Sequence, residues 1–227
     1  MHDSMPGTER ARRFADRYDA GRRLAGELCD YVGRRDVLVV ALPRGGVPVG
    51  FEVARALKAP LDVMQVRKLG VPGHEELAMG AIASGGVRIL SENVVEALRI
   101  PERVIATVAA AEAQELERRE RIYREGRRFP DVRGRTVILV DDGLATGSTM
   151  RAAAAALRSL GAHRLVAAVP VAPKESCDTL RDVVDEVVCA STPERFVAVG
   201  EWYQDFSQTS DEEVSELLRR GQSQEYQ

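Results

Sequence analysis

The sequence predicts an α/β fold in which helices cover both faces of a parallel sheet. Short apolar runs rich in β-branched residues alternate with helical segments along most of the chain, as in parallel strands joined by crossover helices. Two of these runs, at 36–42 and 137–140, are each followed by a loop of small residues and then by a helix. Ligands of such sheets bind beyond the carboxyl ends of the strands, so these two loops are the first candidates for a binding site.

Composition narrows the class of protein. A chain of 227 residues can bury one sizeable core, and we expect a single domain over 1–227. The formal net charge of −3 gives no reason to expect nucleic acid as a partner. No apolar run approaches membrane-spanning length and no secretory signal is visible, which predicts a cytoplasmic protein with no membrane partner. The three cysteines lack metal-ligand spacing and are expected to be free thiols.

Two groups of arginines are interpreted as solvated surface. The first lies on a helix expected over about 9–31, whose apolar stripe is only partial. The second is a basic patch with few interleaved aromatic residues, which does not favour RNA binding. It consists of Arg124, Arg127, Arg128, Arg133 and Arg135.

The loop after the first strand carries a cation and two glycines. The strand at 36–42 runs through the sequence PRGG into a helix expected at 49–57. Gly45 and Gly46 free the backbone to approach a ligand closely. Arg44 adds a permanently charged fork of hydrogen-bond donors. The alternative interpretation is a tight turn with a surface arginine.

A small antiparallel unit is expected after the next strand, at 61–66. Arg67 and Lys68 lead into a segment with three turn-forming residues, which we predict to be a flexible loop. Two short strands at 79–83 and 87–91, joined by a Ser-Gly-Gly turn, then form a β-ribbon.

Helices separate this ribbon from the second candidate loop. The sequence predicts a short helix at 93–98 and a longer one from Pro101 to about 124. Whether this insertion, at about 93–126, packs on the core or forms a dimer surface stays open.

The most informative stretch is 137–149, which reads VILVDDGLATGST. A buried strand is followed by two acids, a loop of small residues and an alanine-rich helix at 150–160, which Ser148 or Thr149 is expected to cap. Free backbone N–H groups and the helix dipole make such a loop an anion site. The neighbouring acids can accept hydrogen bonds from sugar hydroxyls, so the stretch predicts a ribose 5-phosphate site. An ordinary strand-to-helix turn is the alternative.

The chain then continues the alternation. We expect a strand at 164–171, a short helix at 173–180, an edge strand at 186–190, an aromatic segment at 192–206 and a last helix at 211–218.

The run VILVDDGLATGST resembles the signature of the type I phosphoribosyltransferases, which bind phosphoribosyl pyrophosphate (PRPP). Together with PRGGVP and VRKLG, it resembles a poorly characterised branch of that family. The resemblance implies a parallel sheet flanked by helices on both faces, a helical insertion, and a small hood built from about 67–91 and 192–206. It also implies transfer of the phosphoribosyl group to a small-molecule base, with release of pyrophosphate, Mg²⁺ as cofactor and a homodimer. The alternative is a regulatory protein that binds PRPP or a nucleotide without turnover. A third hypothesis is hydrolysis of a phosphoribosyl compound.

The resemblance also assigns site residues. Asp141 and Asp142 would bind the ribose hydroxyls and contact Mg²⁺ through water, and with Arg44 and Lys68 they form the implied catalytic set. The 5-phosphate would be bound by Gly143, Leu144, Ala145, Thr146, Gly147, Ser148 and Thr149. Pyrophosphate would be bound by Arg44, Gly45, Gly46, Arg67 and Lys68, where the family's loop often has an unusual peptide geometry.

The aromatic segment is the expected acceptor site. Its sequence PERFV matches the opening of the segment that stacks the base in purine phosphoribosyltransferases, although Gly200 falls one residue late. The resemblance therefore favours a purine-like acceptor that contacts Phe196, Val197 and Trp202. These side chains could instead close the edge of the sheet as core.

Overall fold

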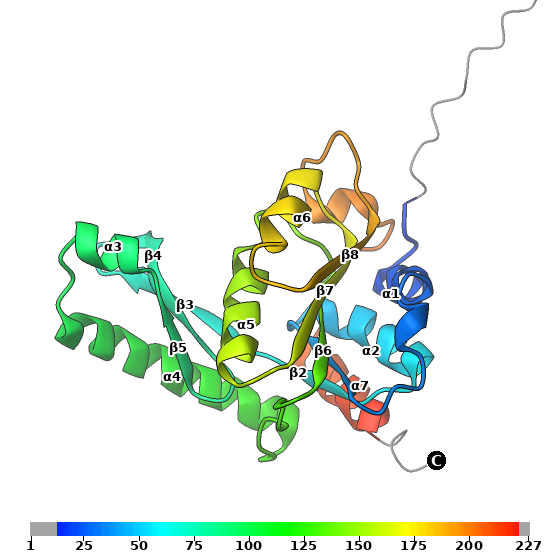
Figure 1. The fold of residues 1–227 in the computed structure, drawn as a ribbon, viewed down its shortest axis with the longest axis horizontal. Coiled ribbons are helices and arrows are strands. Elements are labelled where there is room, and N and C mark those ends of the chain that lie inside the picture. Colours follow the sequence, from blue (N-terminus) through cyan, green and yellow to red (C-terminus); the bar gives the residue numbers. More distant parts are fainter. Residues whose placement is uncertain (1–12, 223–227) are drawn as a thin grey trace, which may run out of the picture.

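Five parallel strands form the central sheet of the molecule (Figure 1). The computed structural model describes residues 13–222, so the expected helix start at residue 9 lies outside the described residues. The strand order is β2-β1-β6-β7-β8, and every neighbouring pair is parallel. The strands are β1 (Val37–Ala41), β2 (Leu61–Val63), β6 (Thr136–Val140), β7 (Arg164–Val171) and β8 (Glu186–Ser191). The predicted α/β fold with a parallel sheet is confirmed.

Helices cover both faces of this sheet (Figure 1). Side chains alternate between the faces along each strand: in β1, Val39 joins the cluster beneath α1, α2 and α7, whereas Leu38 joins the cluster beneath α5 and α6. The helices are α1 (Arg17–Gly26), α2 (Gly46–Leu57), α5 (Ser148–Ser159), α6 (Lys174–Leu180) and α7 (Asp211–Gln222). Short 3₁₀ helices lie at Cys29–Tyr31 and Val199–Trp202.

A second, antiparallel sheet of three strands stands beside the core, and we call it the hood (Figure 1). It is formed by β3 (Val66–Val71), β4 (His74–Ala83) and β5 (Val87–Leu90). Two helices follow it, α3 (Glu92–Ala97) and α4 (Glu102–Arg124). Leu69, Met79 and Leu116 belong to one apolar cluster, so the hood packs on α4 through its own small core.

The prediction of a flexible loop after Lys68 is wrong, because β3 and β4 pair there as a hairpin, with register shifts between Leu69 and Val71. Gly73 has φ +79° and allows a tight turn directly after Val71. Leu69 and Val71 are buried, and this burial against α4 holds the hairpin closed. Residues 192–206 do not pair with the hood sheet; they lie beside α1 and the carboxyl end of β7.

Among residues 13–222, no helix combines the length and the apolarity that crossing a bilayer requires.

Candidate functional site at the switch point of the sheet

The two candidate loops meet at the centre of the parallel sheet. Strands β1 and β6 are neighbours, but the chain leaves β1 toward β2 on one side and β6 toward β7 on the other. The order of strands therefore reverses between them, which is where open α/β sheets bind ligands.

The loops are in direct contact. A Cβ atom added at Gly45 would lie 2.0 Å from Asp142 Oδ2, and one added at Gly46 would lie 2.9 Å from Asp141 Cα. Only glycine allows this approach, so the two glycines after β1 let its loop close against the acids after β6. The peptide bond between Pro43 and Arg44 is cis. Helix α2 begins at Gly46, three residues before the predicted start, because the small loop residues continue into its first turn.

The acidic pair keeps free acceptor oxygens. Asp142 N donates to Asp141 Oδ1 at 2.9 Å, whereas Asp141 Oδ2 and Asp142 Oδ1 have no hydrogen-bond partner among residues 13–222. Burial raises the pKa of Asp141 well above its usual range, and the neighbouring Asp142 charge raises it further. Burial also raises the pKa of Asp142, although the charge of Arg17 opposes this shift.

Arg17 reaches the acidic pair from the first helix. Its Nε donates to Asp142 Oδ2 at 2.8 Å, and its Nη1 donates to Ser207 O at 2.7 Å. Its guanidinium lies 3.9 Å from the centroid of the Phe206 ring. The side chains of Arg17 and Asp142 are only 11% and 16% exposed, so this arginine is not part of a solvated face. That interpretation of the first helix is wrong for Arg17.

The loop after the acids exposes backbone donors. Among the described residues, the N–H groups of Ala145, Thr146 and Gly147 donate to no protein acceptor. Helix α5 begins directly after Gly147, which has φ +71° and occupies the N-cap position. Neither Ser148 nor Thr149 caps the helix as predicted, because both lie inside its first turn. This leaves the dipole and the free N–H groups available to an anion.

The aromatic segment packs on the same crevice. The hydroxyl of Tyr203 donates to Asp142 O at 2.5 Å, and burial raises the pKa of this phenol. Phe196 and Trp202 are partly buried in one cluster with Tyr203, whereas Val197 is 79% exposed. The buried Nε1 of Trp202 has no hydrogen-bond partner within residues 13–222.

The remaining cations make contacts away from the acidic pair. Arg44 lies 3.9 Å from Asp211 at the start of α7. In the hood, Arg67 pairs with Glu112 of α4, and Lys68 Nζ donates to Glu76 O at 3.1 Å. The structure thus brings the two loops and the aromatic segment together, while Arg67 and Lys68 stay bound within the hood and α4.

Close packing at Gly46 gives a prediction about stability. Gly46→Ala is expected to lower the free energy of unfolding by about 1–3 kcal/mol, because the new methyl group meets backbone atoms of Val140 and Asp141 at 2.9 Å. Urea denaturation measures this change. Gly26→Ala is the matched control, since no atom of residues 13–222 beyond its neighbours in the same helix lies within 4 Å of its added Cβ. Equal effects of the two substitutions would contradict the contact between the loops.

A family model and curated relatives match this chain. Residues 13–205 match the phosphoribosyl transferase domain. The chain is 48% identical over 207 residues to a Mycobacterium tuberculosis protein whose naming as a phosphoribosyl transferase is provisional; the match covers 91% of this chain and 46% of that protein. It is 37% identical over 142 residues to a ribose-phosphate pyrophosphokinase of Methanopyrus kandleri, covering 54% of this chain and 49% of the enzyme. The chain therefore spans about half the length of the curated relatives it matches.

One similar solved structure covers nearly the whole chain. A crystal structure of a Thermus thermophilus protein superposes with a TM-score of 0.82 at 41% identity. The match covers 92% of this chain and 98% of that protein.

Proposed function

Because this chain belongs to the phosphoribosyl transferase family, we propose that it transfers the 5-phosphoribosyl group of PRPP to a nitrogenous base. The contact between the two loops at the switch point is the observation that carries this proposal. This contact places a turn that carries an arginine, two carboxylates and a loop with free N–H groups around one crevice. In the reaction, a nitrogen lone pair forms a bond to the anomeric carbon, and the bond from that carbon to pyrophosphate breaks.

Each part of the crevice has a task in this proposal. The loop 143–149 binds the 5-phosphate through its backbone, and the free oxygens of Asp141 and Asp142 accept hydrogen bonds from the ribose hydroxyls. Arg44 lies with Gly45 and Gly46 on the pyrophosphate side of the crevice. As the bond to pyrophosphate lengthens, positive charge develops on the ribose ring, and the nearby carboxylates stabilise it.

The donors at this site fit Mg²⁺ that arrives with the substrate. Among residues 13–222, no group of three or more His, Cys, Asp or Glu side chains could hold a metal. Magnesium usually keeps several waters and binds one or two carboxylates together with substrate phosphates. Asp141 and Asp142 would hold it through water, and when bound it would neutralise charge on the departing pyrophosphate.

The acceptor in this proposal is a purine-like base. A flat ring stacked on Phe196 or Trp202 would gain about 1–3 kcal/mol. Val197 extends the apolar surface next to Phe196.

Calorimetry with PRPP and Mg²⁺, followed by pyrophosphate release, tests the proposal. We expect PRPP to bind, and we expect pyrophosphate to be released when at least one of hypoxanthine, guanine, xanthine or adenine is added. Release only with uracil or orotate would overturn the purine assignment. Binding without release from any base would favour a regulatory protein, and a folded sample that does not bind millimolar PRPP would contradict the proposal altogether.

Lys68 gives a prediction about turnover. If the hood closes over bound PRPP, Lys68 exchanges its contact with Glu76 for the departing pyrophosphate. Lys68→Ala should then lower kcat about tenfold, equivalent to about 1.4 kcal/mol, and leave the Kd for PRPP nearly unchanged. Steady-state kinetics and calorimetry separate the two quantities. Arg103→Ala, at an exposed position of α4, is the control. Unchanged turnover for Lys68→Ala would show that Lys68 is a surface residue without a role in the reaction.

A further inference from the structure

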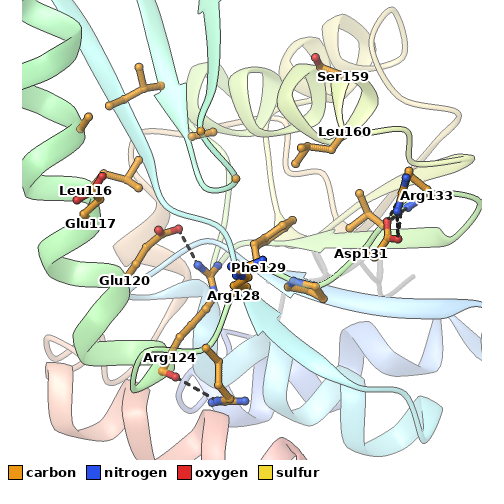
Figure 2. A pocket seen from close by; sticks show the side chains of 18 residues that line it. Leu116, Glu117, Glu120, Arg124, Arg128, Phe129, Asp131, Arg133, Ser159 and Leu160 are labelled. Carbon is orange, nitrogen blue, oxygen red and sulfur yellow. Dashed lines mark hydrogen bonds and ion pairs between the residues drawn. The ribbon is translucent and has the colours of Figure 1, made fainter.

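A large cavity lies between the hood and the core (Figure 2). Its volume is about 790 Å³, within the usual range of small-molecule sites. Its walls come from α4, the turn between β4 and β5, the segment 127–133 and the end of α5. A smaller cavity of about 190 Å³ shares Arg127, Arg128 and Pro130 with it.

This cavity lies at the opposite edge of the sheet from the phosphate loop. The segment 127–133 leads into the amino end of β6, whereas Asp141 follows its carboxyl end. One strand length separates these ends, about 16 Å for a strand of this length at about 3.3 Å per residue. The cavity is therefore distinct from the PRPP crevice.

One part of the wall is apolar and partly flat. Leu116 of α4 is buried, Phe129 is partly buried, and Leu160 follows α5 (Figure 2). A Cβ atom added at Gly85 would lie 3.1 Å from Leu160 Cδ1, so the hood turn rests against the end of α5 and closes this side. The Arg124 guanidinium lies 4.9 Å from the centroid of the Phe129 ring, and Phe129 and Leu160 both contribute apolar surface to the cavity lining.

The wall carries four arginines and three acids, and the acids have other partners: Glu117 pairs with Arg121 outside the cavity. Arg124 is buried and bonded to Asp62 and Glu120, and Arg133 is paired with Asp131. Among the described residues, the Arg127 side chain donates only to the backbone oxygen of Arg124.

Arg128 makes no hydrogen bond or ion pair with the residues that the structure describes, and Figure 2 shows it beside Phe129. Arg127 and Arg128 thus contribute to the lining two guanidinium groups that have no carboxylate partner among residues 13–222. Phosphate accepts hydrogen bonds from several such donors at once.

We propose that this cavity binds a small organic phosphate with a flat apolar ring, of the size of a nucleoside monophosphate. The phosphate contacts Arg127 and Arg128, and the ring lies against Phe129 and Leu160. Because the walls belong to both the hood and the core, the bound molecule contacts both and fixes the placement of the hood. The proposal does not depend on which reaction the other crevice performs.

Photolabelling of the full chain with 8-azidoadenosine 5′-monophosphate, competed by AMP, tests the site. Peptide mapping is expected to find the label within 113–133 or at 159–160. Arg127→Ala/Arg128→Ala should lower this labelling at least about tenfold, because it removes both charge-assisted contacts to the phosphate. Arg35→Ala/Arg103→Ala removes the same charge from exposed positions outside the cavity and should change nothing.

Three results would overturn the proposal. Label found only in 141–149 and 196–206 would place the nucleotide in the crevice at the switch point. Labelling near Phe129 that survives Arg127→Ala/Arg128→Ala would exclude the arginines as phosphate ligands. Loss of a dimer in the same variant, measured by sedimentation, would mean that a second copy of the chain covers the cavity. PRPP should bind to this variant as tightly as to the wild type in calorimetry. An incorrect cavity proposal can therefore be distinguished from an incorrect proposal for the reaction.

Discussion

Asp141→Asn/Asp142→Asn is expected to bind PRPP at least about a hundredfold more weakly than the wild type and to keep its fold. Each carboxylate offers a charge-assisted hydrogen bond to a ribose hydroxyl, and losing one costs about 1.5–3 kcal/mol. The variant loses two such bonds, which accounts for the expected loss of affinity. Calorimetry with PRPP and Mg²⁺ measures this loss.

Stability should change much less than affinity in this variant. Burial raises the pKa of both acids, which means that their charged forms are unfavourable in the folded protein at neutral pH. Asp142→Asn also removes the charge partner of the partly buried Arg17, which opposes this gain, so the melting temperature should change little. Asp30→Asn/Asp182→Asn, which neutralises two exposed acids, is the control. A variant that melts earlier but binds PRPP normally would show that the acids only support the loop.

The core of the fold and the two loops could be predicted because their signals are local. The run of apolar residues before Asp141 marks a strand buried on both faces, and the small residues after it mark the turn into a helix. The contact between the loops follows from topology, since adjacent parallel strands end at the same edge of the sheet. Their roles in binding stay predictions.

Details that depend on tertiary contacts could not be predicted. Lys68 is followed by three turn-forming residues, and only burial of Leu69 and Val71 against α4 makes that segment a hairpin. Nothing near Arg17 in the sequence distinguishes it from the other arginines of the first helix. Its importance comes from Asp142, which is 125 residues away.

Arg17→Gln is expected to lower the free energy of unfolding by about 3–5 kcal/mol at neutral pH, because it leaves Asp142 partly buried without its charge partner. The effect should depend on pH. The charge of Arg17 holds down the pKa of Asp142 against burial, so the substitution raises this pKa further. A carboxyl group whose pKa is raised by folding contributes stability that is present at low pH and lost as pH rises through the folded pKa. The difference between wild type and variant should therefore be small in acid and grow toward neutral pH, as urea denaturation at several pH values would show.

The same substitution should weaken PRPP binding most strongly at lower pH. A protonated Asp142 is a poorer acceptor for a ribose hydroxyl than the carboxylate, and in Arg17→Gln protonation begins at a higher pH than in the wild type. Calorimetry of both proteins at each pH cancels the ionisation of PRPP itself. Arg17→Lys should recover part of the affinity, whereas Arg22→Gln, one turn away on the exposed side of α1, should match the wild type. Tighter PRPP binding by Arg17→Gln at every pH would instead mean that Arg17 blocks the ribose site and must leave Asp142 before substrate binds.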